Sequence, residues 1–408
     1  MRLFIAFTLI SAAVTFGLAI VVLKLGHRYR LYPKIRERDV HTRPTPRLGG
    51  IAMFIGILAA FGVAYLLASQ FPPLQIIFAD PGSILAILGA ALLIVAIGVA
   101  DDLWDLDWMT KLSGQFIAAG LVAWQGVQIY SLPIQGLTIF SGWTSLWLTV
   151  ITIVIVMNMI NFIDGLDGLV AGVALIANSV FFLYSYLLAQ DQSPTNYFSL
   201  ASFIAAILVG ACIGFLPLNW HPAKLFMGDA GALLVGLLMA TSAIAVTGQV
   251  DPVAVTSSRL FPAFIPIILP FAIMIIPLLD FGLAVVRRVS AGKSPFSADR
   301  KHLHHRLLDM GHSHLNAVLI FYGWTAAASV GCLLYFVLPV YFSVPTWYAT
   351  IFIMLALLAC TIVTLAPLTR RKAVEAASQL AHTEPGHPQK FAKLDPLDGA
   401  SDDAQGTA

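Results

Sequence analysis

The stretch "MNMINFIDGLDGLVAG" (Met157–Gly172) closes a run of Ile, Val, Leu and Met and brings in two carboxylates, Asp164 and Asp167, three residues apart. A long uncharged run of this kind is typical of a helix that crosses a membrane. A charge left inside the bilayer costs roughly 2.5–3.5 kcal/mol. The stretch therefore predicts a membrane-spanning helix that ends at the membrane surface, where the acids emerge.

The composition of the whole chain extends this prediction. Of the 408 residues, 59% are hydrophobic and only 11% are charged, whereas about a quarter of the residues in a soluble domain are charged. The sequence therefore predicts an all-α polytopic integral membrane protein with about eleven transmembrane helices. The predicted spans are Leu3–Leu25, Gly50–Ala68, Ile84–Ala100, Gly114–Ile129, Ser145–Met159, Leu169–Leu188, Leu200–Phe215, Ala230–Val246, Phe264–Val286, Ala317–Val340 and Trp347–Ala366.

Basic residues predict the orientation of these spans. The loop between the first two, from Lys24 to Arg47, is rich in Lys and Arg. Such loops stay in the cytoplasm, so we expect the N-terminus outside and, after eleven crossings, the C-terminus inside. We expect residues 1–370 to form a transmembrane catalytic domain and residues 371–408, which lack apolar periodicity, to form a polar, disordered cytoplasmic tail.

Polar side chains gather in the predicted inner loops, although the topology rests on Lys and Arg alone. The acids, amides and histidines fall there, while the outer loops carry few charged residues. One-sided clustering indicates one site at the cytoplasmic surface of the membrane. A non-catalytic transporter or lipid flippase, the alternative of another class, would place polar groups near the middle of the membrane.

Asp101 and Asp102 lie at the inner end of a predicted span, and Lys111 follows. On a helix, adjacent side chains point about 100° apart, so both acids need not face one ligand. They could form a metal-binding or proton-handling pair beside a phosphate-binding lysine. They could equally be solvated acids that mark a loop, and an acidic pair alone favours that second interpretation.

The opening stretch carries four polar residues at a period of three, namely Asn158, Asn161, Asp164 and Asp167. In a helical turn they would form one polar stripe. Oxygen ligands of this kind suit Mg²⁺, which takes few protein oxygens together with substrate phosphates. Capping of the next helix by Asp164 or Asp167 is the simpler alternative, but it does not explain four polar side chains at one spacing.

Two further acids stand in apolar surroundings. Asp229 lies between glycines at the start of a predicted span, where it could serve an anion-binding site or simply cap the helix. Asp280 lies inside a predicted span. An acid inside the membrane is a functional candidate, but pairing with a cation of the inner loop explains it equally, and we expect a structural role.

Histidines cluster in "HLHH", where His302, His304 and His305 lie among basic residues. Three histidines could bind Zn²⁺ or a polyphosphate, and the surrounding positive charge favours phosphate. A basic loop that acts only in topology is the alternative. His312 and His314, further along, receive no function from the sequence.

Together these motifs resemble the polyprenyl-phosphate N-acetylhexosamine-1-phosphate transferase family, the MraY/WecA superfamily. The matching pieces run in order from His41 to about His314 and so cover nearly all of the membrane domain. They are "HTRPTPRLGG", "DDLWDLDWMTK", "NMINFIDGLDGLVAG", "NWHPAKLFMGDAG" and "SPFSADRKHLHHRLLDMGHS". Each is modest alone, but five in order on one membrane face are specific.

The resemblance implies a ten- or eleven-helix fold, a cytoplasmic active site, Mg²⁺ (with Mn²⁺ as a second option) and roles for individual positions. Asp101, Asp102 and Asp164 are the catalytic candidates, and the first two match an acidic pair proposed to handle the lipid phosphate. The implied metal ligands are Asp229 and Asn161, the uridine-binding positions Asp167, Asn219 and Phe226, and the phosphate-binding positions Lys111, His302, His304 and His305. Phe226 is placed to stack on uracil.

The resemblance also implies the reaction. Members transfer a sugar 1-phosphate from a UDP-sugar donor to a polyprenyl phosphate acceptor and release UMP. Leu303 interrupts the three consecutive histidines of the branch that builds the first peptidoglycan lipid. "HLHH" is similar to the branch that uses UDP-N-acetylglucosamine with undecaprenyl or decaprenyl phosphate, and the phospho-N-acetylmuramoyl-pentapeptide transferase is the alternative.

These interpretations fix the expected location and partners. The protein should span a bacterial cytoplasmic membrane several times, with its site on the cytoplasmic face. Its partners should be the UDP-sugar, the polyprenyl phosphate lipid and the membrane, with no nucleic acid and with a homodimer as an option. The second pKa of a phosphate is about 6, so the acidic pair is expected to position the lipid phosphate rather than to deprotonate it.

Overall fold

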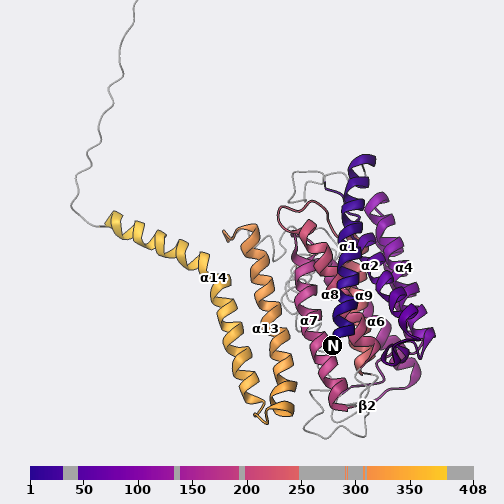
Figure 1. Ribbon diagram of the computed structural model, residues 1–408. Helices are drawn as coiled ribbons and strands as arrows, with labels where there is room; N and C mark the ends of the chain where they lie inside the picture. The colour runs from indigo at the N-terminus through magenta and orange to yellow at the C-terminus, as the bar shows by residue number, and fades with distance from the viewer. Residues whose placement is uncertain are drawn as a thin grey trace, which may run out of the picture. The chain divides into compact units, whose positions relative to one another are not determined.

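The computed structural model describes residues 1–30, 45–132, 138–192, 198–247, 290, 292, 307 and 310–383. Helices dominate this part of the chain, which confirms the predicted all-α polytopic membrane fold. The helices are α1 (Arg2–Tyr29), α2 (Gly49–Leu67), α3 (Pro72–Ile77), α4 (Pro81–Trp104), α5 (Trp108–Trp124), α6 (Gly142–Ile163), α7 (Leu169–Gln192), α8 (Leu200–Asn219), α9 (Gly228–Thr247), α13 (His314–Tyr341) and α14 (Trp347–Thr383). Figure 1 shows their arrangement.

Nine helices of the described residues are long and apolar enough to cross a membrane. Two predicted spans are not among the nine. Phe264–Val286 lies outside the described residues, and the predicted span Gly114–Ile129 corresponds to α5, which has 17 residues. A helix of about 17 residues is at the lower limit for a span.

The predicted bounds of α5 were wrong at both ends. The helix begins earlier because the Asp107 side chain accepts a hydrogen bond from the Thr110 backbone N–H and so caps it. It ends at Trp124 because the chain turns at Gly126, whose φ is +95°, a conformation that favours glycine. A short antiparallel pair, β1 (Ser131–Leu132) with β2 (Thr138–Ile139), follows before α6.

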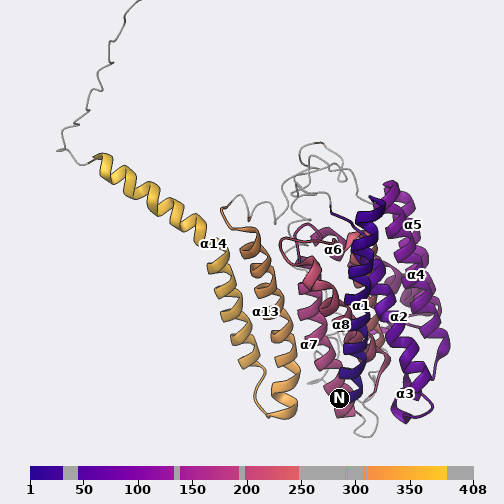
Figure 2. The ribbon, with the colours of Figure 1, turned by 45° about the horizontal axis from the view of Figure 1, so that its top comes forward.

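Helix α9 is the centre of the bundle. It packs against α2, α4, α6 and α8 (Figures 1 and 2), and 89% of its most apolar window is buried. Small residues allow this close packing, since a side chain at Gly98 of α4 would collide with Ala230 of α9, and one at Gly236 with Met157 of α6. Helices in membranes often associate through small residues in this way.

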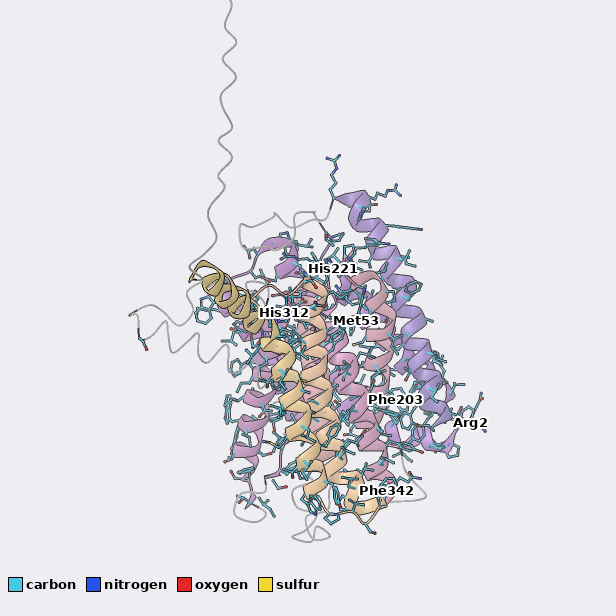
Figure 3. The ribbon with its side chains drawn as sticks, turned by 90° about the vertical axis from the view of Figure 1, so that its left-hand side faces the viewer. Arg2, Met53, Phe203, His221, His312 and Phe342 are labelled. Atoms are coloured by element: carbon cyan, nitrogen blue, oxygen red, sulfur yellow. The ribbon has the colours of Figure 1, made fainter. Side chains whose placement is uncertain are left out.

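Among the described residues, nine helix ends meet at one end of this bundle, which we call the polar end. Here α1, α4, α6 and α8 finish, while α2, α5, α7, α9 and α13 begin. Backbone hydrogen bonds fasten the start of α2 to the segment before α9: the N–H of Gly49 donates to O of Phe226, and that of Gly50 to O of Met227. In Figure 3, His221 and His312 mark the polar end, opposite Arg2 and Phe342.

Exposed tryptophans mark both ends of the bundle. Trp104 and Trp108 are exposed at the polar end, and Trp124 and Trp143 are exposed at the other. Tryptophan is enriched at the two interfaces of a membrane, and α5, which separates Trp108 from Trp124, rises about 24 Å over that length. The polar end therefore lies at one membrane surface rather than in the lipid core.

Contacts between residues divide the chain into Met1–Thr364 and Leu365–Ala408, and the predicted boundary after residue 370 stays a prediction. In α14, only 6% of the apolar window Trp347–Ala366 is buried. Such a continuous apolar surface suits contact with lipid rather than with water.

Candidate functional site

Four helix ends bring five predicted site residues together at the polar end. Asp101 and Asp102 lie in the last turn of α4, and Asp229 lies in the first turn of α9. Lys111 lies near the start of α5, and Asn161 near the end of α6. We call these five residues the acid–lysine cluster.

The Lys111 ammonium group connects two of the acids. Its Nζ lies 2.9 Å from Oδ2 of Asp101 and 3.2 Å from Oδ2 of Asp229. Asn161 Nδ2 donates to the other Asp229 oxygen, Oδ1, at 3.1 Å. The three side chains of the two ion pairs are between 10% and 28% exposed, so the cluster is sheltered but within reach of solvent.

Asp102 completes the cluster from the α4 side. Its Oδ1 accepts a hydrogen bond from the Asp229 backbone N–H at 3.3 Å. This approach needs Gly228, whose φ is +70° and where a side chain would collide with the Asp102 carboxylate. Oδ1 of Asp101 and Oδ2 of Asp102 are buried and have no hydrogen-bond partner within the described residues. Buried oxygens without a partner are costly, so these two oxygens are candidates for contact with a ligand.

Asp164 lies beside the cluster as the C-cap residue of α6. The pKa of its carboxyl is raised to about 7, first because the surrounding protein disfavours the charged form and second because the Asp229 carboxylate is near; Arg47 partly offsets both effects. Solvent nonetheless reaches the Asp164 side chain. This group can therefore exchange its proton with water near neutral pH.

The four polar residues of the opening stretch do not form one stripe, which corrects that prediction. Helix α6 ends at Ile163, so Asp164 and Asp167 leave the helical period. Asn158 donates to Oε1 of Gln115 in α5 and to the Val154 carbonyl of its own helix. Of the four, Asn161 alone hydrogen-bonds Asp229 within the described residues.

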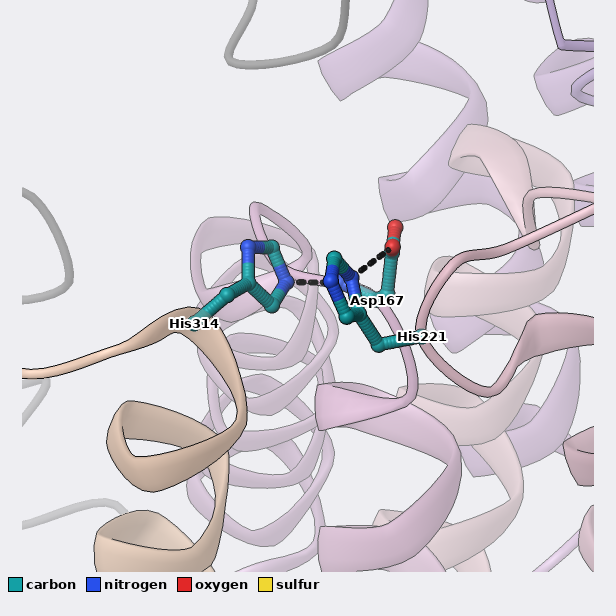
Figure 4. A group of neighbouring side chains, drawn as sticks. All are labelled: Asp167, His221 and His314. Atoms are coloured by element: carbon teal, nitrogen blue, oxygen red, sulfur yellow. Dashed lines mark hydrogen bonds and ion pairs between the residues drawn. The ribbon is translucent and has the colours of Figure 1, made fainter.

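Asp167 belongs to a second group at the polar end, with His221 and His314, which we call the imidazole cluster (Figure 4). Asp167 Oδ2 accepts from His221 Nδ1 at 2.8 Å and from the Ala223 N–H at 3.1 Å. His314 Nε2 accepts from the Asp167 backbone N–H at 3.1 Å. The two imidazole rings stack, with centroids 4.4 Å apart and planes 17° apart.

The other predicted uridine-binding residues flank this cluster. Asn219 is buried, and its amide is engaged with the backbone: Oδ1 accepts from Gly168 N–H and Nδ2 donates to the Leu225 carbonyl. Phe226 is partly buried, and its N–H donates to the Pro46 carbonyl. His302, His304, His305 and Asp280 lie outside the described residues.

Sequence reasoning missed His221 and His314. His221 stands inside the quoted motif "NWHPAKLFMGDAG", and only its position in a loop between two spans could have drawn notice. His314 was given no function. Their pairing joins residues 167, 221 and 314, and no local pattern predicts a contact over such separations.

Comparison with known proteins shows the family of the chain. A model of glycosyl transferase family 4 matches residues 84–247. A decaprenyl-phosphate N-acetylglucosaminephosphotransferase of Mycolicibacterium smegmatis is 40% identical over 367 residues, which cover 89% of this chain and 88% of the relative. The chain belongs to glycosyl transferase family 4. This membership confirms the resemblance to polyprenyl-phosphate N-acetylhexosamine-1-phosphate transferases.

Other members of the family differ in the substrates that their names give. A probable undecaprenyl-phosphate N-acetylglucosaminyl 1-phosphate transferase of Bacillus subtilis is 30% identical over 79% of this chain and 81% of the relative. A phospho-N-acetylmuramoyl-pentapeptide-transferase of Halalkalibacterium halodurans is 30% identical over 84% of this chain and 98% of the relative. The M. smegmatis relative is thus more similar than this muramoyl-pentapeptide enzyme.

Proposed function

We propose that this chain transfers N-acetylglucosamine 1-phosphate from UDP-N-acetylglucosamine to polyprenyl phosphate and releases UMP. The observation that carries the proposal is the acid–lysine cluster at one end of an apolar helix bundle. The 40% identity to a decaprenyl-phosphate N-acetylglucosaminephosphotransferase supports the choice of sugar. The product, polyprenyl-diphospho-N-acetylglucosamine, would open the membrane stage of a cell-wall or surface polysaccharide pathway.

The reaction explains why charged groups gather at a membrane surface. The acceptor is a lipid, and the donor is a water-soluble polyanion. An oxygen of the lipid phosphate attacks the β-phosphorus of the donor, and the bond from that phosphorus to the bridging oxygen breaks, leaving the electron pair on UMP. Two anions must approach each other, and a positioned cation reduces their repulsion and stabilises the leaving group.

Lys111 is the described cation best placed for this task. Its ammonium group is held by Asp101 and Asp229, so it is oriented before substrate binds. The same two acids keep it at the polar end, near the surface that both substrates can reach. We assign Lys111 to a phosphate group of the substrates, and Arg47, which acts electrostatically on Asp164, to the same positive environment.

The cluster also fits a divalent cation. Its ligands would be oxygens, which suit Mg²⁺ or Mn²⁺, and the buried unpartnered oxygens of Asp101 and Asp102 within the described chain indicate missing positive charge. We propose Asp229 and Asn161 as the residues that hold Mg²⁺. Once bound, the ion would neutralise charge on the donor diphosphate.

We assign the acidic pair to positioning. A phosphate monoester with a second pKa of about 6 is already ionised at neutral pH, so little base strength is needed. Asp102, fixed by the Asp229 backbone N–H, would instead orient the cluster toward the lipid phosphate. We assign to Asp164, whose pKa is raised to about 7, the holding and release of a proton during turnover.

We propose that the polar end faces the cytoplasm, with the N-terminus on the other side. The support is the basic loop between Lys24 and Arg47 together with the cytosolic source of UDP-sugars. A protease-accessibility or cysteine-labelling experiment on sealed vesicles would test this orientation. Labelling of a cysteine introduced at Trp220, which is exposed at the polar end, should occur from the cytoplasmic side.

The activity is tested with purified protein, decaprenyl phosphate and Mg²⁺. UMP release is measured with UDP-N-acetylglucosamine and, in parallel, with UDP-N-acetylmuramoyl-pentapeptide. We expect turnover with the first donor and little with the second. The reverse preference would assign the chain to the muramoyl-pentapeptide branch, and no lipid-linked sugar from either donor would contradict the enzyme proposal in favour of a transporter or flippase.

A further inference from the structure

The imidazole cluster is a built arrangement that the proposed reaction does not yet use. It joins three separate elements: the turn between α6 and α7, the loop between α8 and α9, and the first residue of α13. Figure 4 shows the three side chains converging at the polar end. The side chain of Asp167 is 2% exposed and that of His221 is 43% exposed, so a ligand arriving from solvent meets His221 first.

Hydrogen bonds fix the orientation of the His221 ring. An ionised carboxylate only accepts hydrogen bonds, so Nδ1 of His221 carries the proton that Asp167 Oδ2 accepts at 2.8 Å. The same oxygen accepts the N–H of Ala223, two residues further in the loop. Asp167 therefore holds both the ring and the loop that carries it.

His314 limits the movement of the ring from another side. Its imidazole stacks on that of His221 at 4.4 Å. His314 is itself held, because its Nε2 accepts the Asp167 backbone N–H. A histidine with one nitrogen bonded to a carboxylate and one face stacked is preorganised, and preorganisation lowers the entropy cost of binding a ligand.

The second nitrogen of His221 is left for a ligand. Within the described part of the chain, the hydrogen bond of the His221 side chain runs through Nδ1, and no partner is found there for Nε2. We propose that Nε2 of His221 hydrogen-bonds the water-soluble donor, and that Asp167 and His314 are positioning residues that orient it. This inference rests on the proposed function, since it adds a donor-binding residue to that reaction.

A second metal ion is the competing interpretation, because ligand atoms of Asp167, His221 and His314 lie within 4.8 Å of one another. One hydrogen bond opposes it. The lone pair of His314 Nε2 already accepts the backbone N–H of Asp167. Metal-binding nitrogens need a lone pair that points at the ion, and that of His314 Nε2 points at a backbone N–H.

Two amide variants of His221 distinguish its proposed contact with the donor from its hydrogen bond to Asp167. In His221→Asn the amide can still donate to Asp167 from the position of Nδ1, but nothing replaces Nε2. In His221→Gln the amide reaches the position of Nε2, but the contact with Asp167 is lost. His312→Gln is the matched control, since His312 is a neighbouring histidine whose Nε2 bonds the Thr364 carbonyl.

We expect His221→Asn to raise KM for UDP-N-acetylglucosamine about tenfold, the size of one lost hydrogen bond to a polar ligand. Its kcat and its KM for decaprenyl phosphate should stay near the wild-type values. His221→Gln should recover most of the donor affinity, and His312→Gln should match the wild type. Two results would overturn the inference while leaving the proposed function intact. One is a KM of His221→Asn for UDP-N-acetylglucosamine equal to that of the wild type. The other is a higher KM for this donor in His221→Gln than in His221→Asn.

Direct binding gives a readout that does not depend on turnover. Wild type and His221→Asn are each titrated with UMP and with UDP-N-acetylglucosamine. If Nε2 contacts the nucleotide, the variant should lose the same affinity for both ligands. If Nε2 contacts the sugar, the variant should lose affinity for UDP-N-acetylglucosamine alone. If wild type and His221→Asn bound UMP equally well and also bound UDP-N-acetylglucosamine equally well, the inference would be contradicted. A transition metal bound at one per wild-type chain and absent from the variant would also contradict it.

Discussion

The two ends of helix α4 carry acids in opposite electrostatic settings. At the start, Asp80 is the N-cap and accepts hydrogen bonds from the backbone N–H groups of Gly82 and Ser83 and from the Ser83 hydroxyl. At the finish, Asp101 and Asp102 lie in the last turn, which holds no basic residue. Both ends lie in one helix, so propensity and length cannot explain the difference.

The helix dipole makes this contrast informative. An acid at a helix N-terminus is stabilised by the partial positive charge of the free N–H groups, and an acid at the C-terminus is destabilised. Asp80 is thus explained by the fold alone. Asp101 and Asp102 are placed against the dipole and need Lys111 and the Asp229 N–H to hold them. Residues whose charge conflicts with the local helix dipole often belong to functional sites.

The largest expected effect comes from removing the acid that links the cluster. In Asp229→Asn, the ion pair with Lys111 is lost while the backbone N–H to Asp102 remains. We expect UMP release to fall at least about a thousandfold, the upper range for loss of one electrostatic group at a reacting centre. Initial rates at saturating Mg²⁺ measure this, and near-normal turnover would contradict a metal-holding role.

Loss of the cation should come next. Lys111→Met keeps the apolar stem of the side chain but removes the charge that lies between Asp101 and Asp229. We expect kcat to fall about a hundredfold, with the protein still folded. Lys224→Met, a change of the same kind in the neighbouring loop, is the control, and an equal loss in both variants would point to a general charge effect.

At the other end of α4, a change should affect stability and leave chemistry intact. Asp80→Ala removes the cap, which costs about 1 kcal/mol and should lower the thermal midpoint by about 2 °C. Thermal unfolding in detergent measures the shift, and activity at low temperature should match that of the wild type. A large loss of activity would show that this end also takes part in the reaction.

The titration of Asp164 should make stability depend on pH, because its folded pKa is about 7 against an ordinary value of 3.8. Between these values the folded state binds more protons than the unfolded state, so stability falls as pH rises, and the penalty is complete above pH 7. Asp164→Asn removes the penalty. In EDTA, the melting point of Asp164→Asn relative to wild type should therefore be higher at pH 8 than at pH 5; a difference independent of pH would contradict the shift.

The membrane spans could be predicted from the sequence because each span is a local run of apolar residues. The exceptions are informative. The start of α5 depends on the Asp107 cap and its end on the turn at Gly126, and both lie where apolar content alone sets no boundary. In "DDLWDLDWMTK", Asp105 ends α4 and Asp107 caps α5, while the first two acids face Asp229. These roles can be told apart only once the helices are packed.

The site was predictable in part for the same reason. Asp101, Asp102, Lys111, Asn161 and Asp229 were expected together, because each stands at the inner end of a span. The imidazole cluster was not expected, because residues 167, 221 and 314 meet only after three loops fold. Asn219 likewise carries no sequence sign that its amide binds the backbone.

The most direct test of the account exchanges one oxygen for nitrogen at each end of α4. Asp102→Asn and Asp80→Asn are purified together, and UMP release and thermal midpoint are measured for both. Asn caps a helix about as well as Asp, so Asp80→Asn should keep activity within about twofold of wild type. Asp102→Asn should lose at least about a hundredfold in activity without a lower midpoint. Equal activity losses in the two variants, or an active Asp102→Asn, would contradict the assignment of the polar end as the catalytic site.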